Sequence, residues 1–262
     1  MYSDEDVDRA ARRIAQARAD RTIVTLADGL PPLGRADAYR VQTRVCELVM
    51  PAHAAIAGFK VAGMQRSTAS NVAKDLVIAK PLCAALWSHQ VHASGVVLDG
   101  AAHRTLGLET EICLRIGVGT RPGGAKTYEV VGAIAAFEVV EQRLATPIES
   151  SAINLMIADS IANAGIVLGP ETAGWPEGIL DDMASISRNG QLVMERRIGE
   201  RLEDPRRALS VLCEAMDEMG WSIPDGALLL TGLLTTELWL APGDEGQGVI
   251  GRLGRLTASL KA

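Results

Sequence analysis

Two stretches of the sequence place carboxylates inside otherwise apolar runs, and they constrain the fold and the chemistry more than any other feature. They are residues 106–117, LGLETEICLRIG, and residues 130–143, VVGAIAAFEVVEQR. Alternate side chains of an extended strand share one face, so Glu109 and Glu111 point to the same side of the first stretch. Glu138 stands alone among apolar residues in the second. The pattern predicts two strands that carry acidic groups into or beside a core.

A buried carboxylate is costly unless it is paired, protonated or bound to a cation. Three carboxylates that converge from two strands would offer hard oxygen ligands to an octahedral Mg²⁺ or Mn²⁺, with positions left for water and substrate. In the alternative, Glu109 and Glu111 lie on a solvated strand face and Glu138 pairs with Arg143 or Arg115. The spacing alone favours this alternative, because E-x-E is a common pattern.

Length and composition limit the class of protein. The 262 residues fit one large domain, or a small domain and a large one, and 48% of them are hydrophobic, enough for a sizeable core. The net charge of −6 leaves no basic patch, and only 3% of residues are aromatic. Both facts argue against nucleic acid as a partner, since phosphates need cations and unpaired bases stack on aromatic rings.

The four cysteines, Cys46, Cys83, Cys113 and Cys213, are scattered and form no C-x-x-C pair. They predict buried thiols in a reducing compartment rather than a disulfide framework. The N-terminal segment lacks the apolar core of a signal peptide, and no uncharged apolar run reaches the roughly 18 residues that a membrane span needs. We therefore expect a cytoplasmic protein without a membrane partner.

Several segments have the apolar period and the end signals of helices. Ser3 precedes an acidic turn and predicts a helix start, Gly165 and Gly220 are expected to close two helices, and Asp204 before Pro205 is expected to begin one. The expected helices cover residues 4–19, 36–49, 67–74, 150–163 and 205–219.

The remaining ordered segments have the character of strands. Asn189-Gly190 is the strongest local signal, because this pair favours a tight hairpin turn. The apolar segment 77–87 contains Lys80-Pro81 and is interpreted as a connection. The expected strands cover 54–61, 96–99, 106–117, 130–143, 166–168, 184–188, 191–196, 227–231, 237–240 and 247–258. Helices first, then strands with two inserted helices, indicate an α+β fold.

One lysine and three histidines are further candidates for function. Lysines are seldom fully buried, so Lys60 at the end of an apolar strand must reach the surface or meet an anion, and the strand alone favours the surface. His89, His92 and His103 lack a cysteine or carboxylate at metal-ligand spacing and are interpreted as surface histidines. The nucleotide-binding patterns G-x-G-x-x-G and G-x-x-x-x-G-K and the G-x-S-x-G of serine hydrolases are absent.

Short motifs spread over nearly the whole chain occur together in one enzyme family. In chain order they are DAYRVQ (37–42), GFKV (58–61), ETE (109–111), FEVV (137–140), IAD (157–159), GIVLG (165–169), LTG (230–232) and PGD (242–244). Each is weak alone, but their order and spacing together are specific. The chain thus resembles the 2-hydroxypentadienoate (2-oxopent-4-enoate) hydratase and 4-oxalocrotonate decarboxylase branch of the fumarylacetoacetate hydrolase superfamily.

The resemblance implies an architecture and an assembly. The core would be a β-roll like the C-terminal domain of fumarylacetoacetase, with an N-terminal helical and α/β part. Residues 1–75 would form that N-terminal part and residues 76–262 the catalytic β-roll, unless both form one continuous domain. The family also implies a homo-oligomer, although the methionines of the 205–219 helix suit internal packing better.

The resemblance also implies a metal centre for a small-molecule substrate. Glu109, Glu111 and Glu138 match the glutamates that hold a divalent metal, Mg²⁺ or Mn²⁺, which chelates the carboxylate and 2-oxo oxygen of a short 2-oxo acid. Lys60 would lie beside that site as the catalytic residue, either moving a proton or anchoring the substrate carboxylate. The substrate-binding residues implied by the family pattern are Lys60, Ser160 and Thr231.

The chain departs from the family pattern at positions around the implied site. The departures are Ala79 for an acidic residue, Ala84 for a glycine, Met64 for a small polar residue, Ser160 for an asparagine and Leu233 for a serine or alanine. The acid expected at Ala79 would activate the attacking water, so its loss weakens hydration more than 2-oxo acid binding or enolisation. The bulkier lining suggests a substrate with an apolar tail.

Three functions remain open at this point. The first is a metal-dependent hydratase that converts a 2-hydroxy-2,4-dienoate into a 4-hydroxy-2-oxo acid in aromatic catabolism. The second is a decarboxylase or tautomerase of a related 2-oxo diacid such as 4-oxalocrotonate. The third is a non-catalytic partner subunit of an active paralogue, against which the retained carboxylates and lysine count.

Overall fold

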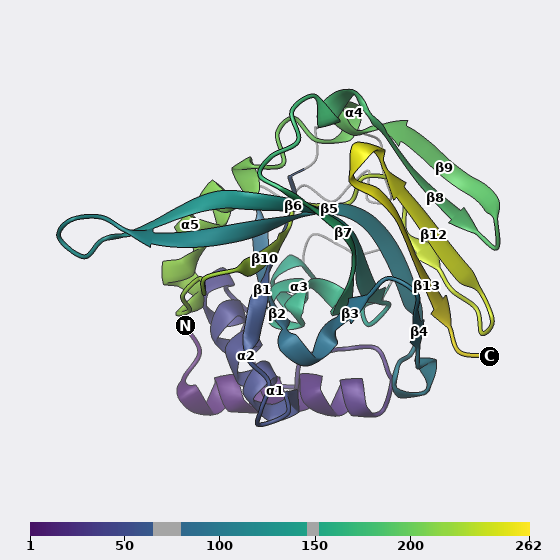
Figure 1. Ribbon diagram of the computed structural model, residues 1–262. Coiled ribbons are helices and arrows are strands. Elements are labelled where there is room, and N and C mark those ends of the chain that lie inside the picture. The colour runs from purple at the N-terminus through teal and green to yellow at the C-terminus, as the bar shows by residue number, and fades with distance from the viewer. Residues whose placement is uncertain (65–79, 146–151) are drawn as a thin grey trace.

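The computed structural model describes residues 1–64, 80–145 and 152–262 and shows an α+β fold built on two sheets (Figure 1). The α+β class and the β-roll expected from the sequence are confirmed. The larger sheet is curled, and the chain combines its two sheets with few helices. Helices α1 and α2 lie below the larger sheet in Figure 1, and the smaller sheet stands at its right. The helix expected over 67–74 lies outside the described residues.

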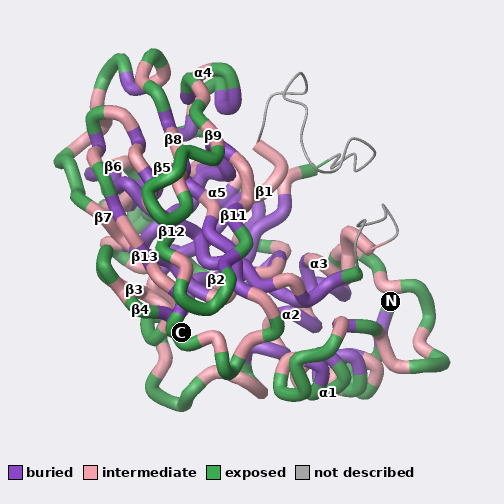
Figure 2. The backbone as a smooth tube through the Cα atoms, turned by 90° about the vertical axis from the view of Figure 1, so that its right-hand side faces the viewer, coloured by how far each residue is buried: buried purple, intermediate pink, exposed green. Residues whose placement is uncertain are grey.

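The two N-terminal helices occupy the predicted segments. Helix α1, Asp4–Ala19, begins at a capping box in which Ser3 and Asp6 satisfy each other's backbone N–H groups. Helix α2, Arg35–Val49, packs against it. Buried and exposed residues alternate along α1 at the edge of the molecule (Figure 2). This amphipathic pattern is the reason why periodicity located the helix in the sequence.

The larger sheet has the strand order β2-β1-β10-β5-β6-β7-β3, with β11 paired to β5. Its strands are β1 (Ile56–Ala62), β2 (Leu82–Trp87), β3 (Val91–Ala93), β5 (Leu106–Thr120), β6 (Lys126–Glu141), β7 (Asn163–Ala173), β10 (Ala227–Leu230) and β11 (Leu238–Trp239). Strand β1 comes from the N-terminal part of the chain, and its neighbours β2 and β10 follow later. The division of the chain at residue 75 stays a prediction.

The smaller sheet has the order β4-β13-β12-β8-β9 and packs on the larger one. Its strands are β4 (Val96–Leu98), β8 (Met183–Arg188), β9 (Gln191–Arg197), β12 (Glu245–Ile250) and β13 (Gly254–Leu260). Glycines on β12 allow the smaller sheet to approach the larger one closely. A Cβ on Gly246 would lie 2.4 Å from the Leu108 side chain, and a Cβ on Gly248 would lie 2.8 Å from Phe137.

The two faces of the larger sheet belong to different apolar clusters. Leu108 and Phe137 belong to the main core, to which the helices and the smaller sheet also contribute. The opposite face carries a smaller buried cluster made of Leu86, Cys113, Ile134, Ala136, Ile166, Leu228 and Leu230. Because Glu109, Glu111 and Glu138 alternate with main-core residues along their strands, they lie on the face of the smaller cluster.

Four local expectations from the sequence are wrong. Segment 82–87 is the buried strand β2 rather than a connection. Helix α3 covers only Ile153–Ala158, and Gly165 lies inside β7 instead of closing a helix. Strand β7 also runs on past Gly169-Pro170, since the pairing between β6 and β7 shifts register there. The run 247–258 is divided by a short 3₁₀ turn into β12 and β13.

The strongest turn and cap signals are confirmed. Asn189 and Gly190 have φ values of 50° and 79° and join β8 to β9 as a tight hairpin. Helix α4 spans Ile198–Arg201, and α5 spans Arg207–Met219 and ends at Gly220 with φ 69°. The buried face of α5 packs inside the chain. The homo-oligomer implied by the resemblance stays a prediction.

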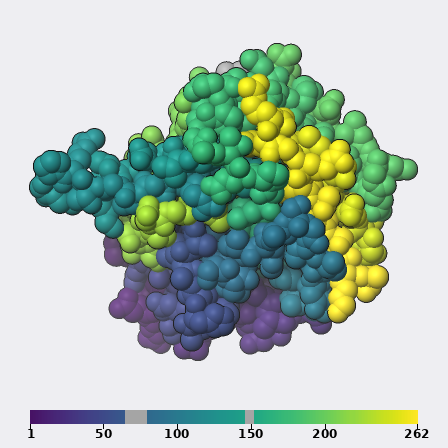
Figure 3. All heavy atoms as spheres, viewed as in Figure 1, coloured from purple at the N-terminus to yellow at the C-terminus, as the bar shows by residue number. Residues whose placement is uncertain are grey.

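Beyond the sheet, β5 and β6 continue as a two-stranded arm that protrudes from the body (Figure 3). The turn at its tip, 121–125, is fully exposed. The cysteines are all free thiols. Cys46, Cys83 and Cys113 are buried, as expected, whereas Cys213 is only half-buried. Among the described residues, no helix has the length and hydropathy needed to cross a membrane.

Candidate metal centre

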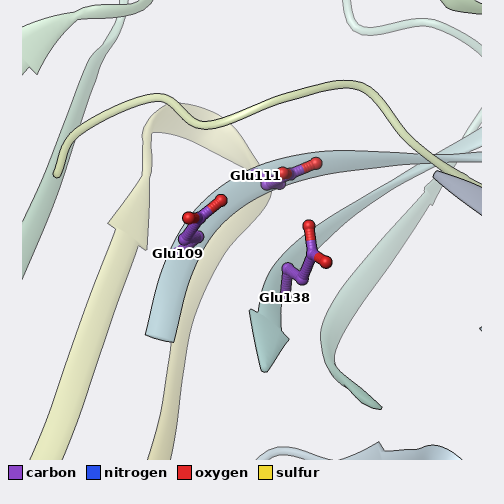
Figure 4. Close-up of side chains that lie close together, drawn as sticks. All are labelled: Glu109, Glu111 and Glu138. Atoms are coloured by element: carbon purple, nitrogen blue, oxygen red, sulfur yellow. The ribbon is translucent and has the colours of Figure 1, made fainter. Parts of the chain in front are cut away.

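Glu109, Glu111 and Glu138 meet at one point. Each offers a carboxylate oxygen, and these oxygens all lie within 4.8 Å of one another. Glu109 and Glu138 are directly paired across β5 and β6, and the carboxyl groups turn toward a common space (Figure 4). Glu138 is fully buried and Glu111 is 2% exposed. The alternative in which Glu111 lies on a solvated strand face is therefore wrong.

The arginines considered as partners of Glu138 are engaged elsewhere. Arg115 forms a bidentate pair with Glu171, with N···O distances of 2.6 and 2.7 Å. Arg143 binds the Asp159 carboxylate through Nε at 2.8 Å. The carboxylate cluster is thus not neutralised by either guanidinium.

The cation that Glu138 meets is Lys60. The Lys60 side chain is almost fully buried, and its Nζ donates to Glu138 Oε1 and to the carbonyl oxygen of Ile161 at 3.1 Å. Asn163 Nδ2 donates to the same Glu138 oxygen at 2.9 Å. The expectation that Lys60 reaches the surface is wrong, because the anion that the burial of a lysine requires is present.

The second oxygen of Glu138 identifies a place for a cation. Glu138 Oε2 is buried and has no hydrogen-bond partner among the described residues, although buried carboxylate oxygens are normally satisfied. Glu111 is oriented by the backbone N–H of Gly232, which donates to its Oε2 at 2.8 Å. A divalent ion between the three carboxylates would satisfy the orphaned oxygen. The all-oxygen donor set suits Mg²⁺ or Mn²⁺.

The ionisation of the centre reflects its excess of negative charge. Burial and the charge of Glu138 raise the pKa of Glu109 to about 8, against the opposing effect of Lys60. Burial and the charges of Glu138 and Glu109 raise the pKa of Glu111 well above its ordinary value. Burial lowers the pKa of Lys60, but the three carboxylates outweigh it and hold the pKa above the usual range. One ammonium does not balance three carboxylates, and a divalent cation would.

A strained turn brings a backbone carbonyl to Lys60. Ser160, Ile161 and Ala162 have φ values of 57°, 52° and 61°, in the left-handed region. This conformation costs roughly 1–2 kcal/mol for each L residue, and a β-branched residue such as isoleucine is rare there. Strain of this kind persists only where the surroundings hold it, and it gathers at functional sites.

The two other predicted substrate-binding residues lie beside groups of the centre. Ser160 Oγ accepts from Arg18 Nη2 at 3.5 Å, and Thr231 Oγ1 donates to the Ile112 carbonyl at 2.9 Å. None of the hydrogen bonds described for these hydroxyls joins them to the glutamates. Their role in substrate binding stays a prediction. The departure at Ala79 lies outside the described residues.

Three groups of the centre were not predicted from the sequence. They are the Ile161 carbonyl, the Gly232 N–H and the Asn163 side chain. The two backbone groups could not be identified from the sequence, because every residue has them. Asn163 could have been singled out, since it is a polar residue between apolar segments. Of the histidines, His89 is exposed, whereas His103 Nδ1 contacts Glu141 at 2.9 Å.

The fold is similar to that of several solved enzymes. 4-Oxalocrotonate decarboxylase from Pseudomonas putida G7, complexed with magnesium and adipate, aligns over 99% of each chain with a TM-score of 0.81 and 21% identity. Fumarylpyruvate hydrolase from Pseudomonas aeruginosa, with Mn²⁺ and pyruvate, aligns over 78% of this chain and 88% of its own, with a TM-score of 0.56 and 16% identity. The chain therefore shares the fold of these solved enzymes, in agreement with the fold that its sequence motifs imply.

A third similar structure is 2-hydroxyhepta-2,4-diene-1,7-dioate isomerase from Mycobacterium marinum, at 15% identity and a TM-score of 0.51 over 79% of this chain and 75% of its own. No protein-family model and no curated protein sequence matches the chain.

Proposed function

We propose that this protein is a divalent-metal-dependent enzyme that stabilises the enol form of a short 2-oxo acid. The observation that carries the proposal is the buried, unpartnered Oε2 of Glu138, which shares its space with the carboxylates of Glu109 and Glu111. The similar hydrolase was solved with Mn²⁺ and the 2-oxo acid pyruvate. The similar decarboxylase was solved with magnesium and a dicarboxylate.

The residues of the centre have distinct tasks in this proposal. An ion held by Glu109, Glu111 and Glu138 would supply Lewis-acid stabilisation of the negative charge that develops on the 2-oxo oxygen. Lys60 has three N–H donors, of which Glu138 and the Ile161 carbonyl take two. The third donor can bind the substrate carboxylate. Because the carboxylates raise its pKa, we propose that Lys60 stays charged and anchors the substrate rather than carrying a proton.

Loss of CO₂ from a 2-oxo diacid is the first candidate reaction. The structural similarity to the decarboxylase covers 99% of both chains, whereas the hydrolase covers 78% of this chain. Ala79, where the family pattern has an acid, also favours decarboxylation, because this reaction needs no activated water. The second candidate is hydration of a 2-hydroxy-2,4-dienoate, which the sequence motifs support.

Metal binding tests the centre itself. We expect wild-type protein to bind Mn²⁺ in a calorimetric titration, and Glu138→Gln to bind it at least about tenfold more weakly, because the substitution keeps the shape but removes a charged ligand. Glu171→Gln is the matched control, since Glu171 pairs with Arg115 outside the centre. Equal Mn²⁺ affinity in all three proteins would contradict the proposal and favour a non-catalytic subunit.

Substrate turnover separates the two candidate reactions. With Mn²⁺ present, CO₂ release from 4-oxalocrotonate supports decarboxylation. Loss of dienoate ultraviolet absorbance from 2-hydroxypenta-2,4-dienoate, without CO₂, supports hydration instead. If neither substrate changes while Mn²⁺ still binds, the proposed reactions are wrong and only the metal centre stands.

A further inference from the structure

One side chain holds both ends of the left-handed turn at residues 160–162. Arg143 Nη2 donates to the carbonyl of Asp159 at 3.1 Å and to the carbonyl of Asn163 at 3.0 Å. These two residues immediately precede and follow the turn. The other two guanidinium nitrogens also donate, Nε to the Asp159 carboxylate at 2.8 Å and Nη1 to Glu141 at 2.9 Å. A guanidinium is a rigid planar fork, so it fixes the separation of the two carbonyls.

The left-handed conformation of this turn places two groups at the metal centre. The Ile161 carbonyl accepts from Lys60 Nζ at 3.1 Å, and Asn163 Nδ2 donates to Glu138 Oε1 at 2.9 Å. Lys60 donates to that same oxygen of Glu138. Relaxation of the turn toward ordinary backbone angles would therefore displace the groups that orient both Lys60 and Glu138.

We propose that Arg143 is a positioning residue that clamps the strained turn and thereby fixes the direction of the Lys60 ammonium in the substrate site. The assignment rests on the proposed function for the role of Lys60. Arg143 is 3% exposed, and its described hydrogen bonds end on Asp159, Asn163 and Glu141 rather than on the glutamates of the centre. It therefore acts through the turn.

Arg18 supplies a matched control for the clamp. Arg18 Nε binds the other oxygen of the Asp159 carboxylate at 2.8 Å, and its Nη2 reaches Ser160 Oγ at 3.5 Å. Neither of these contacts ends on a backbone carbonyl of the turn. The substitutions Arg143→Lys and Arg18→Lys each keep the charge beside Asp159, but only the first removes the fork that joins the two ends of the turn.

Amide hydrogen exchange tests the clamp without any turnover. In Arg143→Lys we expect the amides of residues 160–163 to exchange at least about tenfold faster than in wild type, since local opening reports the lost restraint. In Arg18→Lys we expect a change of less than about threefold at the same amides. Equal exchange in Arg143→Lys and Arg18→Lys would overturn the clamp.

A double-mutant cycle tests the path through Lys60. The measured quantity is the affinity for oxalate at saturating Mg²⁺, in wild type, Arg143→Lys, Lys60→Gln and the double variant. We expect Arg143→Lys to weaken oxalate binding by about tenfold in the wild-type background and by less than about twofold when Lys60 is already replaced. Equal effects in both backgrounds would mean that Arg143 acts independently of Lys60, and would overturn the proposal.

Relief of the strain provides a rescue. Ala162 has φ 61°, which glycine adopts without penalty, so Ala162→Gly lets the turn keep its shape without the clamp. We expect Arg143→Lys with Ala162→Gly to bind oxalate within about threefold of wild type. Absence of rescue would count against the clamp. If wild type binds no oxalate with Mg²⁺, the proposed function fails, and the exchange comparison still decides whether Arg143 holds the turn.

Discussion

Lys60 on β1 donates to Glu138 on β6, although β10 and β5 lie between these strands in the sheet. In a flat sheet three strand spacings would separate β1 from β6 by about 14 Å, which a lysine side chain cannot span. The curl of the sheet brings β1 and β6 close enough for this contact. The centre is therefore a product of sheet curvature, and it requires residues that are 78 positions apart in the chain.

Metal binding should release protons. Burial and the charge of Glu138 hold the pKa of Glu109 at about 8, so the metal-free centre carries a proton at neutral pH that an incoming ion displaces. We expect the affinity for Mn²⁺ to rise between about pH 5.5 and pH 8. Calorimetry at about pH 7 in two buffers of different ionisation enthalpy should show release of at least about one proton for each ion bound, because the pKa of Glu111 is raised as well.

The raised pKa of Glu109 also affects the stability of the metal-free protein. The folded pKa of Glu109 lies above its ordinary 4.5, so its contribution to folding is fully present below pH 4.5 and is lost as the pH rises through about 8. In EDTA, the melting temperature should fall over this range, and Mn²⁺ should restore it. A metal affinity and a metal-free melting temperature that are both independent of pH would contradict a raised Glu109 pKa.

Asn163 should strengthen metal binding although it is not itself a proposed ligand. Its Nδ2 donates to Glu138 Oε1 at 2.9 Å, and partners that orient a ligand commonly affect metal affinity by about 10–100-fold. We expect Asn163→Ala to weaken Mn²⁺ binding by about tenfold. Asn154→Ala is the control, because the hydrogen bond described for Asn154 ends on the Leu33 carbonyl, at 2.8 Å, rather than on a glutamate of the centre. Equal Mn²⁺ affinity in the two variants would show that Asn163 does not contribute to metal binding.

Gly58 should be intolerant of any side chain. A Cβ at this position would lie 2.0 Å from the backbone oxygen of Leu228 on β10, which cannot move without breaking the parallel pair that carries Lys60. We expect Gly58→Ala to lower the free energy of unfolding by about 3 kcal/mol or more in urea titrations. Gly34→Ala should cost about 0.5 kcal/mol, because its Cβ would meet only Asp37 Oδ2 at 3.8 Å. Similar losses in both variants would refute the close approach of β1 and β10.

The carboxylates of the centre could be predicted from the sequence because each is an exception to its surroundings. Glu109 and Glu111 share a strand face by their spacing, and Glu138 interrupts an apolar run. The family motifs, rather than the spacing, selected the metal hypothesis over the arginine pairs. The partner of Lys60 could not be predicted from its strand, since the contact depends on the curl of the sheet.

The turn at residues 160–162 shows where sequence patterns fail. Nothing in Ser160, Ile161 and Ala162 favours a left-handed backbone, and the apolar period before them indicates a longer helix. A tertiary contact, the guanidinium of Arg143 on the two flanking carbonyls, overrides these local preferences. Strand β2 was missed for a related reason, because an apolar run beside a proline is ambiguous until its pairing with β1 is known.

Glu141, which binds the same Arg143, should make the fold sensitive to acid. Burial raises its pKa, but the hydrogen bond from His103, the charge of Arg143 and the Arg104 N–H outweigh burial and lower the pKa from 4.5 to about 2. A carboxyl whose folded pKa is depressed contributes stability that is fully present above pH 4.5 and is lost as the pH falls through about 2. Glu141→Gln should therefore be less stable than wild type at neutral pH and lose less further stability between about pH 5 and pH 3.

Urea titrations at each pH measure both effects, with Glu129→Gln on the exposed arm as the control. Parallel losses in wild type and Glu141→Gln would show that Glu141 does not titrate as its contacts predict.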